Sequence, residues 1–498
     1  MNFKNNNRLE IIDKKPISVF NNRQSSESFA RDIANIKNVS GDSKPFYVMD
    51  LGRVQNLINF WTTNLPRVHP FYAVNCNYDP VLMNILASSP SIGFFANSKE
   101  MIEKIFEFTD DSSRIFYGNP LLTGNSLNIA VKRNISYITF YSLNDLKKIS
   151  LQCPEVKIVL EVNIQNEMPS EDPSAYMGAS IEEVPSILAA VYKLNLHLVG
   201  FSFTVGQDRQ HPMAYRNAFS IVRNLFEMAE DFGLGKMSFI NIGSGFSASN
   251  NLEIRQFKNI ADEINASIDY FFQSTDYHNL YITANPGKFF AASAFSLLTN
   301  IISKDIVDAD SIVHKNVSTP RSAYIYKVNE GCYGSFSCKI NNTITPKCSP
   351  LFDENDSEDG QYFYGSVIGP SDCQSDVIQE VCHFRKMNVG EWLIWENMGA
   401  YSLSNYEEPF EMESSEAIQP LVFYYVSNDD WQDIINSSNK INNQTSIEAL
   451  YDGVFPNENV VGSIDDVYSI ASSEEYEDDD DKMEELQELF NVFEVVYS

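Results

Sequence analysis

The sequence has no CxxC pair, no HxxxH or HExxH spacing and no apolar run long enough to span a membrane. Its seven cysteines are an odd number, which favours free thiols in a reducing compartment over a disulfide framework. The six histidines lack the spacing of a zinc site, so we expect no bound metal. The first 26 residues lack the apolar segment of a secretory signal. These absences predict a soluble cytoplasmic protein.

Positive charge is scarce, because 36 Lys and Arg stand against 67 Asp and Glu and give a formal net charge of −31. This balance argues against nucleic acid or an anionic membrane as the main partner. Much of the acid lies in the segments 353–359 and 463–498. A hydrophobic content of 43% over 498 residues is nevertheless typical of a folded protein with two or three domains.

Strand-like and helix-like segments alternate along residues 46–292. Nearly continuous apolar runs, such as 157–162 and 198–205, are followed by amphipathic segments such as 213–232. About eight such units favour a closed (β/α)₈ TIM barrel, which carries its functional site on the turns after the strands. The turn Gly243-Ser244-Gly245 follows one of these strands.

The pattern changes after residue 292. Short apolar stretches separated by polar or Gly/Pro turns predict a mainly antiparallel β domain over 293–435. Residues 436–498 are polar and then acidic. Near the end, apolar residues recur on one face of a possible terminal helix: Met483, Leu486, Leu489, Phe490, Phe493, Val496 and Tyr497. The segment is either a short acidic helix that docks on a partner or on the body, or a solvated tail.

Several motifs resemble the eukaryotic ornithine decarboxylase and antizyme inhibitor family. The stretch 71–77 is similar to the family motif Tyr-Ala-Val-Lys-Cys-Asn, and others follow in the family order at 46–52, 65–68, 119–120, 242–246, 286–287, 331–336, 369–371 and 396–401. The resemblance implies an alanine-racemase-like barrel over 46–292. It also implies that residues 1–45 contribute to the β domain, and that active relatives hold pyridoxal phosphate in a site shared across a dimer.

The resemblance also implies that the cofactor-contacting positions have changed their chemistry. Asn75 stands at the Schiff-base lysine, and a carboxamide is not a nucleophilic amine. Phe95 replaces an aspartate and Glu161 replaces an arginine, which reverses a charge. Thr204 replaces the histidine that stacks on the pyridine ring, and Asn285 replaces the glutamate that keeps the ring nitrogen protonated.

Some of the residues that the resemblance assigns to the cofactor phosphate match the family pattern. Gly243-Ser244-Gly245 retains a turn whose backbone N–H groups could approach an anion, although the turn could equally be kept for its shape alone. Lys288 replaces an arginine and loses its fork geometry, whereas Tyr401 matches a phosphate-contacting tyrosine.

The positions that the resemblance assigns to substrate binding also differ from the family pattern. Glu330 replaces an aspartate that binds the substrate amine, and Asp372-Cys373 reverses the family order Cys-Asp. In an extended segment this exchange points the carboxylate the other way.

These changes together predict a pseudoenzyme with no cofactor. The first hypothesis is an antizyme inhibitor whose partner surface includes Lys132, Arg133, Lys147 and Lys148. The alternatives are a regulatory partner of an active ornithine decarboxylase paralogue, a residual decarboxylase of putrescine biosynthesis, and a binding module for a small anion. A homodimer is compatible with each of them.

Overall fold

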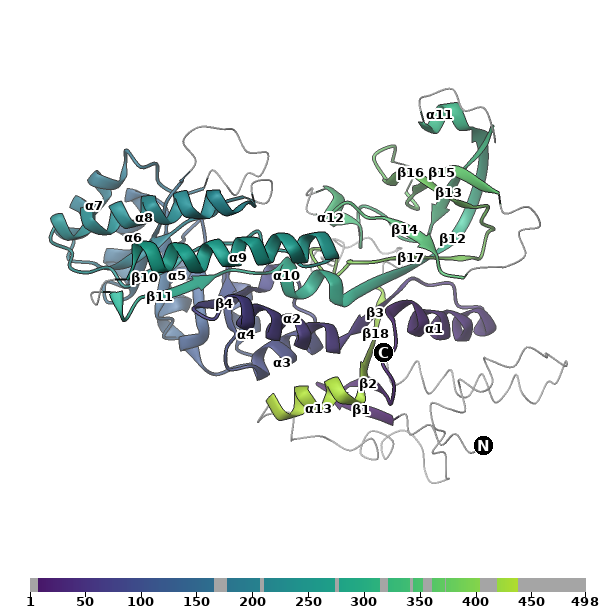
Figure 1. Ribbon diagram of the computed structural model, residues 1–498, viewed down its shortest axis with the longest axis horizontal. Coiled ribbons are helices and arrows are strands. Elements are labelled where there is room, and N and C mark those ends of the chain that lie inside the picture. The colour runs from purple at the N-terminus through teal and green to yellow at the C-terminus, as the bar shows by residue number, and fades with distance from the viewer. Residues whose placement is uncertain are drawn as a thin grey trace. The chain divides into compact units, whose positions relative to one another are not determined.

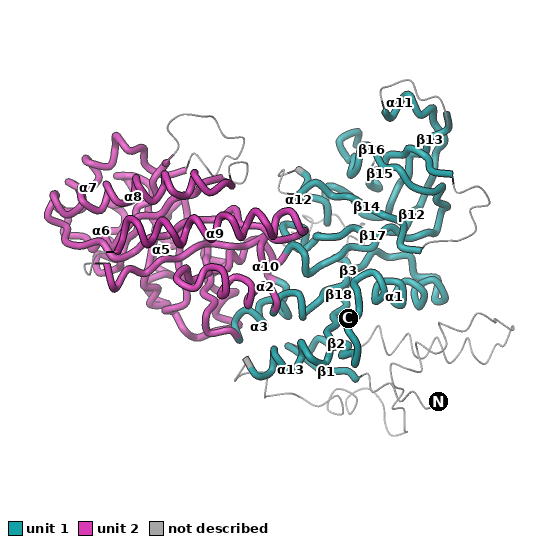
Figure 2. Tube along the Cα trace, in the orientation of Figure 1, with its two compact units in different colours: residues 1–55, 79–88, 292–498 teal, residues 56–78, 89–291 magenta. Residues whose placement is uncertain are grey.

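The computed structural model describes residues 8–164, 177–206, 210–273, 277–313, 321–340, 344–352, 361–371, 373–403 and 419–437. These residues form two compact units (Figure 2). One comprises residues 56–78 and 89–291, and the other comprises 1–55, 79–88 and 292–498. The expected terminal helix, the acidic segment 353–359 and Asp372 lie outside the described residues.

Eight parallel strands of the first unit close into a barrel. They are β4 (Val68–Ala73), β5 (Gly93–Ala96), β6 (Ile115–Gly118), β7 (Tyr137–Phe140), β8 (Lys157–Glu161), β9 (His197–Ser202), β10 (Phe239–Asn241) and β11 (Tyr281–Ala284). Strand β11 pairs with β4 and completes the circle. The predicted barrel is therefore confirmed.

Helices occupy the connections between these strands. They are α4 (Lys99–Ile105), α5 (Gly124–Lys132), α6 (Leu143–Gln152), α7 (Val184–Lys193), α8 (Pro212–Asp231) and α9 (Asn251–Phe271). Local sequence explains their starts, since Thr123 and Ser126 form a capping box at α5 and the Asn250 side chain accepts from two backbone N–H groups at α9. Helices α8 and α9 lie side by side (Figure 1). The short helices η1 (Val74–Cys76) and α10 (Lys288–Ala291) follow β4 and β11.

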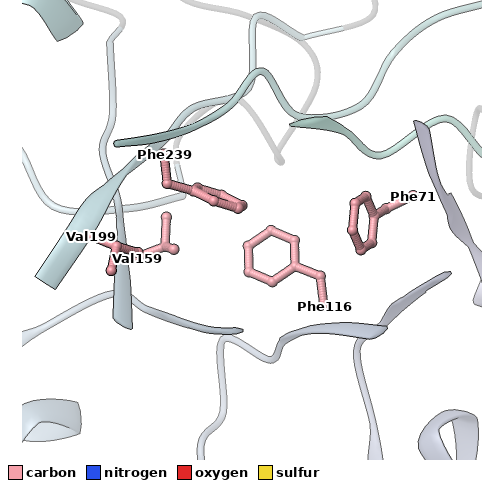
Figure 3. Close-up of a cluster of buried hydrophobic side chains, with 5 residues drawn as sticks. All are labelled: Phe71, Phe116, Val159, Val199 and Phe239. Atoms are coloured by element: carbon pink, nitrogen blue, oxygen red, sulfur yellow. The ribbon is translucent and has the colours of Figure 1, made fainter. Parts of the chain in front are cut away.

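Aromatic side chains fill the interior of the barrel. Phe71, Phe116, Val159, Val199 and Phe239 form its buried core, and the ring of Phe116 lies between those of Phe71 and Phe239 (Figure 3). Its ring centroid is 6.1 Å from that of Phe71 and 5.5 Å from that of Phe239. This layer packs the lumen, and barrels of this kind carry their functional sites at the carboxyl ends of the strands.

The second unit contains a ten-stranded, mostly antiparallel sheet. Its strands are β1 (Arg8–Ile12), β2 (Lys15–Phe20), β3 (Phe46–Asp50), β12 (Phe295–Asp308), β13 (Ser322–Val328), β14 (Cys348–Pro350), β15 (Tyr362–Ile368), β16 (Val377–Arg385), β17 (Trp392–Trp395) and β18 (Leu421–Ser427). The exceptions are β18, which runs parallel to β2 and β3, and β13, which runs parallel to β15. A second, mainly antiparallel sheet is therefore confirmed.

Strand β3 belongs to this sheet, between β18 and β12, so the first barrel strand is β4 rather than the segment at residue 46. The residues from Phe46 to Met49 are fully buried. A strand covered on both faces has the same continuous apolar pattern as a barrel strand, so the pattern alone does not distinguish the two.

The helices associated with this unit are α1 (Ser26–Ser40), α3 (Pro80–Ser88), α11 (Ala309–Val313), α12 (Ser337–Ile340) and α13 (Asn428–Ser437), and α2 (Leu51–Asn64) begins in it. Across the described ranges, none of the helices combines the length and the apolar character that crossing a bilayer requires.

Candidate functional site

A row of polar side chains runs across four neighbouring strands at the carboxyl end of the barrel. Glu161, Ser202, Asn241 and Thr283 are direct neighbours in the strand register. Thr283 Oγ1 donates to Asn241 Oδ1 at 3.1 Å, and Asn241 Nδ2 donates to Ser202 Oγ at 2.8 Å. The Ser202 hydroxyl in turn bonds Glu161. We call these four residues the polar layer, and all of them are buried.

Sequence reasoning found Glu161 and missed the other three members of the polar layer. Strand alternation would have found two of them. Asn241 lies two residues after Phe239 and Thr283 lies two residues after Tyr281, and both aromatic side chains belong to the packed lumen. Because side chains alternate between the two faces of a strand, these residues point inward as well.

Glu161 is a buried carboxyl group that no cation balances. Burial raises its pKa to about 7, and hydrogen bonds from Ser202 and Thr204 partly oppose that increase. Within the described residues no Lys, Arg or His forms an ion pair with it. The carboxyl group is therefore solvated by hydroxyls alone, and its ionised form is costly.

Asn285 follows β11 directly and continues its ladder, since its backbone N donates to Gly243 O at 2.7 Å. Side chains alternate between the two faces of a strand, and those of Tyr281 and Thr283 face the lumen. The side chain of Asn285 therefore lies on the lumen side as well. Asn285 is 7% exposed, and its Oδ1 is buried without a hydrogen-bond partner. An unpaired buried carbonyl oxygen is uncommon in a folded protein and is suited to accept from a bound donor.

Asn75 and Phe95 lie at two other strand ends. Asn75 is half-buried in the η1 turn after β4. Its carboxamide cannot form an imine. Phe95 packs its ring 5.5 Å from that of Phe116 and so extends the aromatic core rather than offering a polar group.

The glycine turn after β10 keeps an unusual backbone. Gly243 and Gly245 have φ angles of 68° and 106°, in the left-handed region that favours glycine. A Cβ on Gly245 would lie 3.3 Å from Cδ of Gln210, whose Nε2 donates to Gly206 O at 3.1 Å. Tyr215 holds the same amide by donating its hydroxyl to Gln210 Oε1 at 2.8 Å. The space beside Gly245 is thus taken by Gln210.

The cation near the expected phosphate position faces a carboxylate. Burial opposes ionisation of Glu253, but hydrogen bonds from Ser247 and Ser249 together with the charge of Lys288 hold the pKa of Glu253 below its usual value. Ser247 Oγ and the Ser249 backbone N donate to Glu253 at 2.5 and 2.7 Å. The charge of Lys288 therefore already attracts a carboxylate in this fold.

The expected substrate-end residues lie in the other unit. Glu330 Oε1 is buried and accepts from the backbone N of Gly331 at 3.0 Å and of Ser335 at 3.3 Å. Exposed Cys373 accepts from the Tyr333 hydroxyl at 3.1 Å, and this bond lowers the pKa of the Cys373 thiol.

Two further residues of this unit, Tyr401 and Asp376, contact the segments just described. Tyr401 adopts a φ angle of 58°, and its carbonyl oxygen accepts from Ser337 Oγ at 3.2 Å. Asp376, which sequence reasoning missed, is buried and accepts from Cys332 N at 2.7 Å and from Ser371 Oγ at 2.7 Å. It organises the turn that carries Cys373.

The four basic residues expected on a partner surface lie on or next to α5 and α6. Lys132 and Lys147 are exposed. The Arg133 guanidinium lies 4.5 Å from the centroid of the Phe106 ring, and Lys148 Nζ donates to Leu122 O at 2.7 Å. The charges of Lys132 and Lys147 are therefore less engaged by contacts within the protein than those of Arg133 and Lys148.

The comparisons with known proteins agree with this architecture. A family model described as "Pyridoxal-dependent decarboxylase, pyridoxal binding domain" matches residues 51–292. The ornithine decarboxylase of Caenorhabditis elegans is 33% identical over 432 residues, which are 86% of this chain and 99% of that one. The chain belongs to the family of ornithine decarboxylases and antizyme inhibitors.

Other members of the family cover similar shares of the chain. Antizyme inhibitor 2 of Xenopus laevis is 34% identical over 374 residues, 75% of this chain and 80% of that one. Among solved structures, the arginine decarboxylase of Paramecium bursaria Chlorella virus bound to agmatine has a TM-score of 0.68 at 28% identity and covers 79% of this chain and 99% of that one.

Active decarboxylases of this family depend on pyridoxal phosphate, and the groups in this barrel do not fit it. No amine stands at Asn75 to hold an aldehyde. The lumen offers the buried carboxyl of Glu161 and the unpaired acceptor of Asn285. The side chain of Gln210 fills the space beside Gly245. These groups favour a donor or a cation over a phosphorylated anion.

Proposed function

We propose that this chain is a catalytically inactive member of its family that acts in the regulation of polyamine biosynthesis by binding antizyme. The observation that carries the proposal is Asn75 at the position that the resemblance assigns to the Schiff-base lysine. Phe95 in the aromatic core and the buried Glu161 support it, because each replaces a group of opposite character.

Purified full-length protein supplied with pyridoxal phosphate and L-ornithine is expected to release no CO₂ above a protein-free blank. The single change Asn75→Lys is expected to leave that result unchanged, because Glu161 and Asn285 still oppose the cofactor electronically. The assay measures labelled CO₂, with the ornithine decarboxylase of Caenorhabditis elegans as the positive control. Release of CO₂ by the unmodified chain that requires pyridoxal phosphate would falsify inactivity.

Helices α5 and α6 support the partner-binding part of the proposal. They are adjacent in the barrel and carry both Lys132 and Lys147. Exposed large apolar side chains gather on or beside the same helices: Leu121, Val131, Leu143 and Leu151. Sequence reasoning missed this apolar set. Apolar groups beside cations are suited to a partner with an acidic, partly apolar surface.

The double change Lys132→Glu and Lys147→Glu is expected to weaken antizyme binding at least about tenfold, because two attractive charges become repulsive. The affinity is measured by surface plasmon resonance with immobilised antizyme at physiological salt. Lys193→Glu, an exposed lysine in the last turn of α7, is the matched control and is expected to bind normally.

Equal binding by the double variant would remove α5 and α6 from the interface, and no binding by the unmodified chain would contradict the antizyme proposal. Co-purification of an active ornithine decarboxylase with the tagged chain, without antizyme, would instead support the role of a regulatory partner.

A further inference from the structure

We propose that the C-terminal segment 483–497 of this chain docks as an amphipathic helix on the exposed face of α6. That face presents Leu143, Lys147 and Leu151, and we call it the α6 stripe. The contact lies within one chain and requires no antizyme, so it goes beyond the proposed function. One consequence does rest on that function: the docked segment covers part of the surface assigned to antizyme and competes with it.

The α6 stripe is an apolar helix face that points away from the barrel. Its three residues are four positions apart, so their side chains line up along one side of the helix. Leu146 and Ile149 on the other side are buried. Leu143 is 42% exposed and Leu151 is 84% exposed. The outer face of a surface helix is normally polar, so leucines on both sides of a lysine indicate a surface that another segment covers.

The segment before α5 enlarges this surface. Lys148 Nζ donates to Leu122 O at 2.7 Å, so that segment lies against α6. The side chain of Gln152 also reaches Gly124, where an added Cβ would lie 2.8 Å from Nε2. Leu121, the neighbour of Leu122, is 78% exposed. The surface therefore combines leucines from two segments with the lysines of α6.

The sign of the charge beside these leucines selects the occupant. Asp145 of α6 is buried and pairs with Lys148, whereas Lys147 is exposed. Other strongly exposed apolar side chains have a carboxylate as their sequence neighbour, as in the pairs Leu252–Glu253, Tyr270–Asp269 and Ile306–Asp305. In a chain with a formal net charge of −31, an apolar surface beside a cation is therefore suited to an acidic apolar segment.

The end of the chain has the matching chemistry. Its apolar residues recur on one helical face, which we call the tail stripe: Met483, Leu486, Leu489, Phe490, Phe493, Val496 and Tyr497. Residues 483–498 contain four glutamates and no lysine or arginine. A helix of about 15 residues is marginal in water by itself, so burial of the tail stripe against the leucines is what stabilises it.

The length of the intervening chain permits the contact. Helix α13 ends at Ser437, and 45 residues, 438–482, separate it from the tail stripe. Such a stretch spans up to about 150 Å when extended, so chain length does not restrict which side of the barrel the segment reaches. Because both surfaces belong to one chain, their effective concentration is about millimolar, and a weak contact is enough for occupancy.

Photocross-linking of the full-length protein without antizyme tests the contact. The photoreactive residue p-benzoylphenylalanine replaces Phe493, and mass spectrometry maps the cross-linked peptides. The main product is expected to join the tail to residues 143–152 or 121–123. An equal mixture of unlabelled and ¹⁵N-labelled chains is expected to give products within chains of one isotope, because the contact is intramolecular.

Variants of the α6 stripe separate this contact from chance proximity. Leu151→Ser and Lys147→Glu are each expected to lower the yield of that product at least about threefold, because each removes one part of the complementary surface. Leu252→Ser is the matched control, since Leu252 is a similarly exposed leucine beside Glu253 and is expected to leave the yield unchanged. Circular dichroism checks that each variant is folded.

Three results would overturn the inference: a main product elsewhere on the body, mixed-isotope products as abundant as same-isotope ones, or an unchanged yield in folded Leu151→Ser. The second of these would assign the surface to another copy of the chain. If the photoreactive chain does not fold, hydrogen exchange of the unmodified protein and of Phe493→Ser decides. Equal exchange rates in α6 would then contradict docking. Failure of the chain to bind antizyme contradicts the proposed function alone.

Discussion

Gly200→Ala is expected to destabilise the barrel by roughly 4 kcal/mol or more, which is exceptional for the addition of one methyl group. Gly200 lies in β9, where its backbone passes directly against β10. An added Cβ would overlap the carbonyl oxygen of Phe239 and lie 2.6 Å from its carbonyl carbon. Because these atoms belong to the backbone, no side-chain rotation relieves the contact. Urea unfolding followed by circular dichroism measures the change.

The matched control is Gly124→Ala at the start of α5. There an added Cβ would meet only Nε2 of the Gln152 side chain, at 2.8 Å, and this flexible group can move. Alanine also favours a helix over glycine, so the control is expected to unfold within about 1 kcal/mol of the unmodified chain. If Gly200→Ala and Gly124→Ala unfold at the same urea concentration, the close approach of β9 to β10 is contradicted.

Glu161→Gln is expected to make the protein more stable than the unmodified chain at pH 8, by up to roughly 3 kcal/mol. Burial raises the pKa of Glu161 from 4.5 to about 7 in the folded state. The protonated folded form therefore contributes stability that is fully present below pH 4.5 and is lost as the pH rises through about 7. Glutamine never ionises, so the variant does not suffer that loss.

The measurement is the difference in the free energy of unfolding between variant and unmodified protein at several pH values. The difference is expected to be small near pH 4 and to grow until about pH 8. Other carboxyl groups whose pKa is raised by desolvation, such as Asp50, are common to both proteins, and their contributions cancel. Glu155→Gln, at an exposed position, is the control and is expected to follow the unmodified chain at every pH. A constant difference across the range would contradict the buried, uncompensated carboxylate.

The sequence by itself determined the class of fold and the family. Alternating apolar and amphipathic segments predict a parallel barrel because the periods of strands and helices are local properties of the chain. The motifs that carry the resemblance are also local, and they mark Asn75, Glu161 and Asn285 as departures from the family pattern.

Only the tertiary structure decided how these residues meet. The strand register joins Glu161 to Ser202 and Asn241, which are far apart in the sequence, and it leaves Asn285 Oδ1 without a partner. It also assigns Phe46–Asp50 to the sheet of the second unit. The physical reason is that burial, hydrogen bonding and charge balance depend on which strands become neighbours, and the pattern within one strand carries no record of that choice.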